Sequence, residues 1–262
     1  MVDFQRKDSY NVQDLVDIVR LLRAPDGCPW DGAQTHQSIR RNFLEEAYEV
    51  AEAIDEGSPE HLREELGDVL LQVVFHAGIE SDAGRFDLDG VADGICKKLI
   101  YRHPHVFDTV QVSGAGEVLR NWDTLKQAEK GQATTADTMA AVARSLPSLW
   151  RAEKVQKKAA KTGFDWPDIS GALDKLSEEL EELKDAIRQG TNVEEELGDL
   201  LFSAVNAARF AQVDPEQALS GATDKFILRY RTMEQQLLAE GRSPDSLDLS
   251  EWNQRWEEAK EP

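Results

Sequence analysis

Two nine-residue stretches of the sequence are nearly identical, and they constrain the fold more than any other feature. REELGDVLL occupies residues 63–71, and EEELGDLLF occupies residues 194–202. In both copies acidic residues stand directly before a run of apolar residues, as in a helix that enters a hydrophobic core. A tryptophan precedes each copy, Trp30 in GCPWD and Trp166 in GFDWPD. The sequence therefore predicts that one helical unit occurs twice.

Apolar spacing predicts an all-α fold for both units. Apolar residues recur at helical intervals in 42–54 and again in 172–187, with glutamates between them. The segment 59–80 begins acidic and becomes almost wholly apolar, so its second half should be buried, and 190–210 is its counterpart in the later copy. No convincing strand pattern accompanies them. We expect each unit to be a bundle or half-bundle of helices.

Local chemistry indicates where several helices begin and end. Ser58 offers a capping hydroxyl immediately before a proline, which suits the first helical position. Thr191 and Glu194 have the spacing of a capping box. A proline separates His103 from His105, so we interpret this pair as a turn after a helix in preference to a catalytic or metal site.

The segment between the two copies is rich in small and polar residues. We interpret 130–138 as the exposed edge of the first unit and the start of a linker. The expected units are therefore 1–135 and 136–262. A basic amphipathic stretch at 145–161 leads into the second unit, and its lysines are interpreted as solvated surface.

Composition argues against several classes of function. The 262 residues include 50 acidic and 30 basic side chains, a formal charge of -20. Such a charge repels polyanions, which argues against nucleic-acid binding and against attraction to acidic membranes. We expect a cytoplasmic protein, because no apolar run approaches the roughly 18 residues of a membrane span and the N-terminal segment lacks a signal-peptide pattern. Cys28 and Cys96 belong to no CxxC or Cys/His cluster, so neither a disulfide framework nor a zinc site is expected.

Carboxylates form two matching sets. Each set is EExxE on one predicted helix and ExxD on the next, and residues three apart share one helix face. The first set is Glu45, Glu46, Glu49, Glu65 and Asp68. The second set is Glu178, Glu179, Glu182, Glu196 and Asp199. If the two helices of a unit pack antiparallel, four carboxylates of each set converge.

Such a set is either solvated acidic surface or a metal site. The pairs adjoin core-facing leucines and valines and recur with similar gaps, which favours convergence. Two unit charges at about 4 Å repel by roughly 4 kcal/mol at an effective dielectric constant near 20. Mg²⁺, or alternatively Mn²⁺, would offset this repulsion because both prefer oxygen ligands. A di-iron carboxylate bundle is disfavoured, since no histidine stands three residues after a glutamate.

Basic and aromatic residues accompany the acidic motifs at repeated spacing. Two basic pairs, each one helical turn apart, either reach phosphate oxygens from one helix face or lie on plain surface. The pairs are Lys98 with Arg102 and Lys225 with Arg229. Four tryptophans either stack on a nucleobase or are structural core residues. They are Trp30, Trp122, Trp166 and Trp256.

Taken in order along the chain, these motifs resemble the bacterial MazG nucleoside triphosphate pyrophosphohydrolases. The resemblance rests on two copies of EExxE and ExxD together with GCPWD, GRFD, RHPHVF and GFDW, and it covers nearly the whole chain. It implies an all-α homodimer that depends on Mg²⁺ and hydrolyses nucleoside triphosphates to the monophosphate and pyrophosphate. Mg²⁺ would neutralise the triphosphate and activate a water for attack at the α–β linkage. Clearance of aberrant nucleotides and adjustment of a nucleotide pool both stay open as biological roles.

The resemblance also implies site residues by position. Metal ligands would be Glu179, Glu182, Glu196 and Asp199 in the second unit, matched by Glu46, Glu49, Glu65 and Asp68 in the first. Triphosphate or nucleotide contacts would be Lys175, Lys225, Arg229 and Trp256, with Lys98 and Arg102 as first-unit counterparts. The general base would be Glu178 or one of the ligand glutamates.

One departure separates the two copies. The position of Lys175 is occupied by Asn42 in the first copy, and the neighbouring Arg41 either substitutes for the lysine or does not. We therefore predict that the second unit carries most of the turnover and that the first is weaker or mainly structural. The rival hypothesis is a catalytically silent helical module that binds nucleotides or a protein partner. The preferred base and sugar are not predicted.

Overall fold

The computed structural model describes residues 4–129 and 133–260, and over these residues the chain is helical without strands. This confirms the predicted all-α class. Two compact units divide the chain, unit 1 at Met1–Lys126 and unit 2 at Gln127–Pro262. Within the described part, no helix combines the length and the apolar character needed to cross a membrane.

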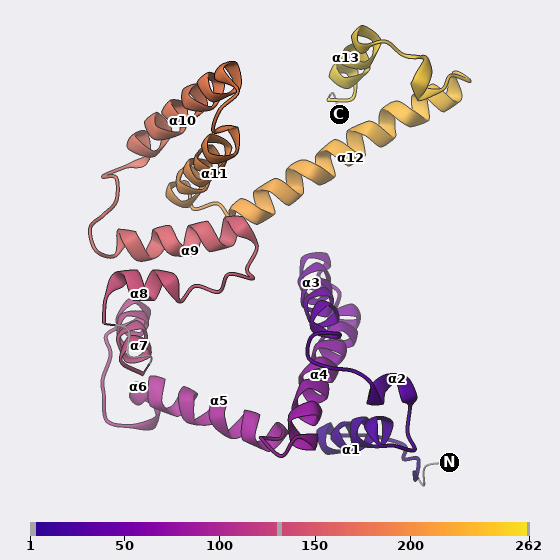
Figure 1. Ribbon diagram of the computed structural model, residues 1–262, viewed down its shortest axis with the longest axis vertical. Helices are drawn as coiled ribbons and strands as arrows, with labels where there is room; N and C mark the ends of the chain where they lie inside the picture. Colours follow the sequence, from indigo (N-terminus) through magenta and orange to yellow (C-terminus); the bar gives the residue numbers. More distant parts are fainter. Residues whose placement is uncertain (1–3, 130–132, 261–262) are drawn as a thin grey trace. The chain divides into compact units, whose positions relative to one another are not determined.

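Unit 1 is built around a hairpin of two long helices (Figure 1). The helices that begin in it are α1 (Val12–Arg23), α2 (Pro29–Gly32), α3 (Arg40–Glu56), α4 (Pro59–Asp82), α5 (Leu88–Arg102), α6 (Pro104–Phe107) and α7 (Ala115–Glu129). Helices α3 and α4 pack side by side, and α1 packs against α4. Gly57 ends α3 in the left-handed region at φ 67°. The Ser58 side chain then accepts a hydrogen bond from the backbone N–H of His61 at 3.3 Å, which confirms the predicted cap of α4.

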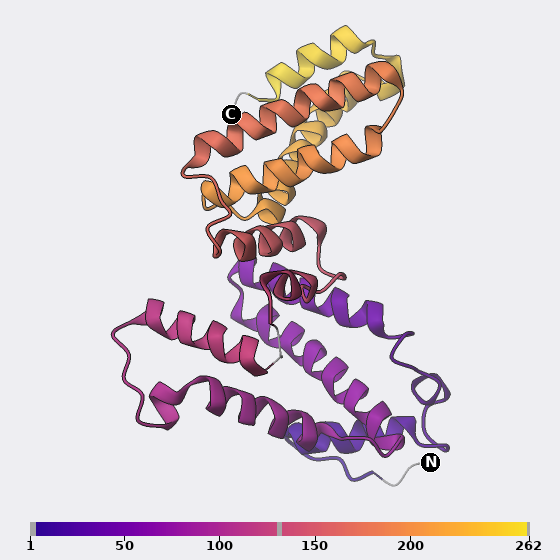
Figure 2. The same ribbon diagram turned by 60° about the vertical axis from the view of Figure 1, so that its left-hand side comes forward.

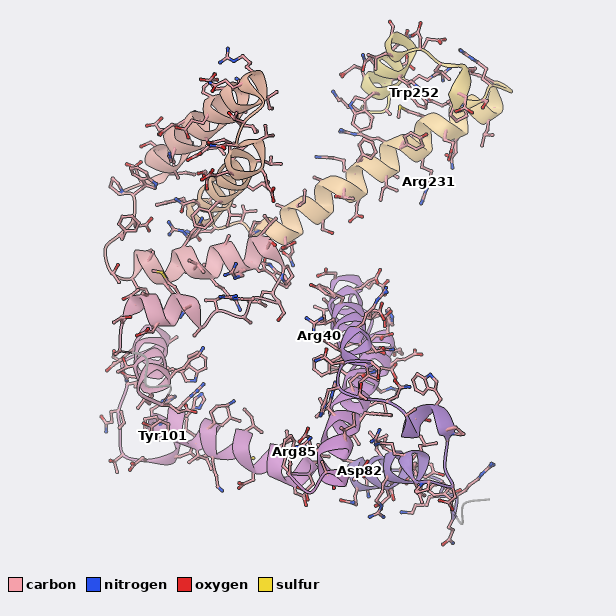
Figure 3. The ribbon with its side chains drawn as sticks, in the orientation of Figure 1. Arg40, Asp82, Arg85, Tyr101, Arg231 and Trp252 are labelled. Carbon is pink, nitrogen blue, oxygen red and sulfur yellow. The ribbon has the colours of Figure 1, made fainter. Side chains whose placement is uncertain are left out.

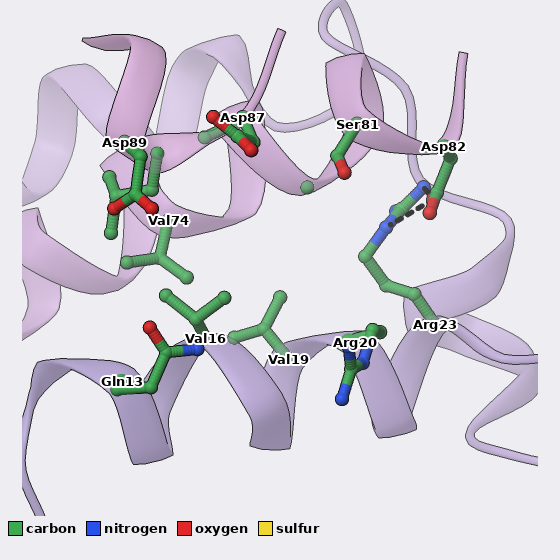
Figure 4. A pocket seen from close by; sticks show the side chains of 13 residues that line it. Gln13, Val16, Val19, Arg20, Arg23, Val74, Ser81, Asp82, Asp87 and Asp89 are labelled. Atoms are coloured by element: carbon green, nitrogen blue, oxygen red, sulfur yellow. Dashed lines mark hydrogen bonds and ion pairs between the residues drawn. The ribbon is translucent and has the colours of Figure 1, made fainter. Parts of the chain in front are cut away.

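The core of unit 1 lies where α1 meets α4. The buried cluster consists of Val19, Ile39, Val74 and Phe75. Val19 and Val74 point into the space between the two helices (Figure 4) and are 1% and 2% exposed. Arg23 closes one edge of this space, because its guanidinium lies 5.0 Å from the ring centre of Phe75 and pairs with Asp82 at 2.8 Å. Aliphatic packing of the amphipathic α1 on the apolar half of α4 thus fixes the α3–α4 hairpin.

Unit 2 repeats the hairpin. Its elements are α8 (Thr135–Ala140), α9 (Ser148–Ala160), α10 (Ile169–Gln189), α11 (Val193–Phe210), α12 (Pro215–Ala239), the 3₁₀ turn η1 (Pro244–Ser246) and α13 (Leu249–Glu258). Helices α10 and α11 pack side by side, and α9 packs across α11 (Figure 1 and Figure 2). The Trp150 indole of α9 donates a hydrogen bond to Asp214 at 2.9 Å, which ties α9 to the start of α12. The far half of α12 packs on α13 and buries Met233 and Leu237.

Of two local expectations near helix ends, one is wrong and one is present. The capping box predicted at Thr191 and Glu194 is wrong, since Asn192 is the N-cap residue of α11 and makes no side-chain cap bond. Asn192 adopts φ 57°, a left-handed conformation that asparagine tolerates better than the β-branched threonine. The turn expected at His103 is present as the end of α5, followed directly by the four-residue helix α6.

The expected linker is partly structured. Residues 130–132 of the predicted segment 130–138 lie outside the described residues. From residue 135 the chain forms α8, whose start carries a capping box made by Thr134 and Asp137. The basic stretch that follows is α9, which keeps most of its lysines toward solvent but buries Gln156. Segment 135–138 is therefore part of the helical structure of unit 2.

Candidate active site

Acidic residues of two helices meet at one point in unit 2. Carboxylate oxygens of Glu179 from α10 and of Glu196 and Asp199 from α11 lie within 4.8 Å of one another. Glu179 is only 5% exposed, because it faces the interface of the α10–α11 pair. The structure thus brings together three of the four acids expected as ligands in this unit.

The fourth expected ligand, Glu182, lies one turn further along α10. Loss of hydration raises the pKa of Glu182, and the neighbouring carboxylate of Glu179 adds to the rise. Glu182 therefore borders the cluster without joining the closest set of oxygens. The smaller of these two causes, repulsion from Glu179, is one that a bound cation would relieve.

Lys175 lies one turn before the cluster on α10 and contacts it directly. Its ammonium pairs with Glu179 at 2.7 Å and with Glu178 at 2.9 Å. Hydrogen bonding to these two carboxylates raises the pKa of Lys175, so the lysine stays charged. Glu178 is exposed and is held by Lys175 beside the triad, in which Glu179 is buried, Glu196 half-buried and Asp199 exposed.

The chemistry of this donor set fits a hard divalent cation. Every member of the close triad is a carboxylate, and the triad contains no nitrogen or sulfur ligand. Mg²⁺ and Mn²⁺ prefer such oxygen donors, and Mg²⁺ commonly combines one or two protein carboxylates with phosphate oxygens of a substrate. The single positive charge of Lys175 leaves the triad with an excess of negative charge.

Unit 1 contains a corresponding cluster. Oxygens of Glu46 and Glu49 from α3 and of Glu65 from α4 lie within 4.8 Å of one another. Burial raises the pKa of Glu46, and the charge of the fourth predicted acid, Asp68, is the next cause. His61 adds a contact that unit 2 lacks at the matching position, with its Nε2 3.1 Å from Glu65.

The lysine of unit 2 has no replacement in unit 1. Asn42 occupies its position in α3, four residues before Glu46. The guanidinium of Arg41 instead pairs with Glu45 at 2.7 Å, and its side chain is 87% exposed. Arg41 therefore does not substitute for Lys175, because it pairs with Glu45 and no ion pair among the described residues joins it to the half-buried Glu46.

The basic pairs lie on different helices from the acids and contact tryptophan rings. Arg102 lies 5.3 Å from the ring centre of Trp122, and Arg229 lies 5.4 Å from that of Trp256. The repeat therefore extends to this cation–aromatic contact. Within the described residues, no ion pair joins Lys225 or Arg229 to the acid cluster of unit 2. Lys98, the partner of Arg102, is half-buried on α5.

Aromatic contacts continue along the same face of unit 2. Phe226 lies 5.2 Å from Trp256, measured between ring centres. Trp252, labelled in Figure 3, stacks on Tyr230 at 5.8 Å with an interplanar angle of 16°. Helix α13 is thus held on α12 by rings next to Arg229. Trp30 and Trp166 take no part in these ring contacts and are 62% and 44% exposed.

Sequence reasoning missed a polar cluster in unit 1. His36 Nδ1 lies 2.7 Å from Nδ1 of His76, and His36 Nε2 lies 2.5 Å from Glu80. Arg85 also donates to Glu80 at 2.8 Å, and hydrogen bonds from Arg85 and His36 lower the pKa of Glu80 to about 2. Burial lowers the pKa of His76, and His36 adds to the effect. The available signal was the spacing of four residues between His76 and Glu80.

Several cavities also lie away from the acid clusters, one of them beside the His36–His76 pair. In unit 1 a cavity of about 220 Å³ lies between α1 and α4, bordered by Val16, Val19 and the Arg23–Asp82 pair (Figure 4). In unit 2 a cavity of about 440 Å³ lies beside α9 and α11 and includes Gln156 in its wall. None of the predicted site residues borders either cavity, apart from Trp166 in the second.

The paired acid clusters in tandem helical units are accompanied by a clear family match. A sequence model of the MazG nucleotide pyrophosphohydrolase domain matches residues 34–107 and 169–233, the regions that contain both clusters. The chain is 43% identical over 248 residues to a Thermotoga maritima protein named nucleoside triphosphate pyrophosphohydrolase/pyrophosphatase MazG, covering 95% of both chains. It is 40% identical over 254 residues to an Escherichia coli K12 protein named nucleoside triphosphate pyrophosphohydrolase, covering 95% of this chain and 97% of the other. The protein belongs to the MazG nucleotide pyrophosphohydrolase family.

Proposed function

We propose that this member of the MazG family, a nucleoside triphosphate pyrophosphohydrolase, acts with Mg²⁺ at the acid cluster of unit 2 and releases nucleoside monophosphate and pyrophosphate. One observation carries the proposal: Glu179, Glu196 and Asp199 place oxygens within 4.8 Å of one another where α10 meets α11, with Glu179 buried there. Three such charges at that separation need a counter-cation, and a triphosphate chelates the same kind of cation.

The residues of unit 2 then have separable roles. The metal would be held by Glu179, Glu182, Glu196 and Asp199. When bound, Mg²⁺ supplies charge neutralisation of the triphosphate and activation of water at the α–β linkage. Lys175 holds Glu178 and Glu179 in place and offers a positive charge to a phosphate oxygen.

Glu178 is our candidate for the general base of unit 2. It stands outside the close triad, it is exposed to solvent, and Lys175 fixes its carboxylate at 2.9 Å. A carboxylate in that position is free to accept the proton of an attacking water, whereas the triad members would be occupied by metal. Glu45, its counterpart in unit 1, is instead paired with the exposed Arg41.

We also propose that the protein works as a homodimer, which its own surface supports. The chain exposes 18558 Å². Two separate globular proteins of half its mass would together expose about 14,000 Å². The surplus is larger than the roughly 800 Å² that one partner contributes to a standard interface. Much of it is apolar: Phe226, Ile227 and Leu228 in the middle of α12 are 56%, 48% and 63% exposed.

A product assay tests the proposed reaction. The purified protein is incubated with each common nucleoside triphosphate and Mg²⁺, and phosphate products are separated. Pyrophosphate and monophosphate in equal amounts are expected, and removal of metal with a chelator should abolish both. Release of orthophosphate would contradict the proposed bond cleavage, and absence of turnover with every triphosphate would favour a silent binding module. Light scattering of the same sample should give twice the mass of one chain.

A further inference from the structure

Two histidines of unit 1 face each other through the same ring nitrogen. His36 lies in the segment before α3, and His76 lies on α4. Their Nδ1 atoms are 2.7 Å apart, while their ring centres are 5.0 Å apart and the ring planes differ by only 8°. The rings therefore lie edge to edge in nearly one plane, with both Nδ1 atoms between the ring centres. At this distance one nitrogen must donate a hydrogen bond and the other must accept it.

Glu80 decides which of the two nitrogens donates. Its carboxylate lies 2.5 Å from His36 Nε2 and accepts a hydrogen bond from Arg85 at 2.8 Å. Hydrogen bonds from Arg85 and His36 lower the pKa of Glu80 to about 2, so the carboxylate is ionised and only accepts. His36 therefore carries a proton on Nε2, and in its neutral form its Nδ1 is an acceptor. The Nδ1 of His76 then carries the single proton that lies between the rings.

The pair has room for one more proton but not for two. A proton added at His76 Nε2 leaves the contact between the rings intact. A further proton at His36 Nδ1 would place two N–H groups head to head at 2.7 Å, with no acceptor between them and with both rings positively charged. Burial lowers the pKa of His76, and the neighbouring His36 adds to this effect. Full protonation of both rings therefore breaks the contact that joins His36 to α4.

The charged groups around the pair are few. Among the described residues, the one ion pair of either histidine is that of His36 with Glu80, which Arg85 holds from the turn after α4. The other residues that border the adjacent cavity of about 410 Å³ are apolar. They are Phe43 of α3, Val73 and Ala77 of α4, Phe86 of the turn and Val91 of α5. Helix α1 also packs on α4, but its four charged side chains pair elsewhere, Arg23 with Asp82, Arg20 with Asp17 and Asp14 with Lys7.

The closed contact therefore binds fewer protons than an open one. Once the rings separate, each titrates near the ordinary histidine pKa of about 6.5. Below that pH the open form holds at least one proton more than the closed form. The closed form is thus fully favoured above about pH 6.5, and its equilibrium constant falls about tenfold for each pH unit below.

The contact holds the chain where it enters α3. Segment 33–39 joins α2 to α3, and its own hydrogen bonds are local. The Thr35 N–H donates to Ser38 Oγ at 2.9 Å, and the Ile39 N–H donates to the Thr35 carbonyl at 3.3 Å. The ties of this segment to α4 are the His36 contact and the packing of Ile39 in the core. Opening of the histidine pair therefore removes the polar one of these two ties.

We propose that His36 and His76 form a pH-sensitive switch, in which one shared proton holds segment 33–39 on α4 and protonation of both rings releases it. The switch is independent of the proposed reaction. Unit 2 provides the contrast, since all five histidines of the chain lie in unit 1. Acidification from about pH 6.5 to about pH 5 should loosen the entry to α3 and leave the entry to α10 unchanged.

Amide hydrogen exchange of the full chain measures this opening directly. Protection factors, which correct for the intrinsic pH dependence of exchange, are compared for residues 35–39 and for residues 163–168 before α10 at about pH 7, 6 and 5. In wild type the protection of 35–39 should fall about tenfold between pH 6 and pH 5, while 163–168 keeps its protection. Equal pH dependence in the two segments would overturn the switch.

Variants assign the effect to the ring pair. His76→Asn keeps a donor at the position of Nδ1 but removes the titrating ring, so the protection of 35–39 should no longer depend on pH. His105→Asn is the matched control, because His105 belongs to the other close histidine pair, whose ring centres are 5.7 Å apart and whose planes are tilted by 54°. It should behave as wild type.

Two outcomes contradict the assignment. The switch is overturned if His76→Asn keeps the wild-type pH dependence of 35–39, or if His105→Asn removes it. His36→Asn carries the same expectation as His76→Asn and decides the question should His76→Asn fail to fold, because the His36 side chain is 40% exposed and lies outside the helices.

Discussion

Unit 2 holds its close carboxylate triad beside Lys175, whereas unit 1 holds a related but differently composed triad near Asn42. In unit 2 the ammonium is 2.7 Å from Glu179. In unit 1 the nearest basic residue by sequence, Arg41, contacts Glu45 at the surface. The two units thus share the helical hairpin and the motif spacing, but they differ in which acids lie closest together and in the cation beside them. Duplication of the fold has thus preserved the acidic motif more closely than the arrangement of its charges or the cation that neutralises them.

The largest effect should come from removing one ligand in each unit. Asp199→Ala should lower kcat for pyrophosphate release at least about hundredfold, since loss of a group that orients a metal already costs 10–100-fold. Asp68→Ala is the matched control and should keep at least half of the activity. Steady-state assays at saturating Mg²⁺ measure both. Equal losses from the two variants would contradict the functional difference between the units.

The free energy of unfolding should respond differently to alanine substitution at Gly27 and at Gly163, which stand three residues before Trp30 and Trp166 in the two units. At Gly27 an added Cβ would come 2.2 Å from the backbone oxygen of Leu21, whereas Gly163 has open space but φ 86°. Gly27→Ala should therefore destabilise unit 1 by about 2 kcal/mol, because the contacting atom is backbone and must shift. Gly163→Ala should cost about 1–2 kcal/mol in unit 2 through conformational strain. Urea unfolding measures both, and a silent Gly27→Ala would refute the close approach.

Swapping the residues at the equivalent positions Lys175 and Asn42 should lower the activity of unit 2 and raise that of unit 1. Lys175→Asn should lower kcat/KM for pyrophosphate release about tenfold, the loss of one charge-assisted contact. Asn42→Lys, assayed in the Asp199→Ala background, should raise the residual activity by supplying unit 1 with its missing cation. Asn42→Gln serves as the uncharged control. No gain from Asn42→Lys would show that the difference between the units lies elsewhere than in this charge.

The smallest expected effect is on the stability of unit 1 without metal, where the Glu46 carboxylate lies close to other acids. Burial raises the pKa of Glu46 above 4.5, so its ionised form costs folding stability at neutral pH. Glu46→Gln should therefore raise the urea midpoint slightly at pH 7 in chelator, and the gain should vanish as the pH falls toward 4.5. With Mg²⁺ the sign should reverse, because a ligand is lost. Glu52→Gln, an exposed change on the same helix, should show neither effect.

Sequence patterns predicted those features that depend on residues close in the chain. The hairpin of α10 and α11, the cap at Ser58 and the meeting of Glu179 with Asp199 all follow from helical periodicity and repeated spacing. The start of α11 was mispredicted because Thr191 and Asn192 are both plausible caps. The left-handed backbone at Asn192 decided between them.

Features that depend on packing between distant segments were not predictable in the same way. The buried oxygen of Gln156 exists because α9 crosses α11 at Phe202, 46 residues later in the chain. The pairing of His36 with His76 likewise spans 40 residues. A lone glutamine in a lysine-rich helix carries no periodic signal of such burial. Comparison of the two copies compensates partly, because it singles out positions that differ between the units, such as Lys175 and Asn42.

The start of α11 has a consequence for the metal-ligand set. Helix α11 begins at Val193, three residues before Glu196, whereas α4 begins at Pro59, six residues before Glu65. The unpaired amides of a helix's first turn carry partial positive charge and stabilise a nearby carboxylate by about 0.3–1 kcal/mol. In unit 2 the polypeptide backbone itself thus serves as a counter-charge for Glu196, and in unit 1 it is too far from Glu65 to do so. The place where a helix begins thereby sets the electrostatic cost of assembling a divalent-cation site.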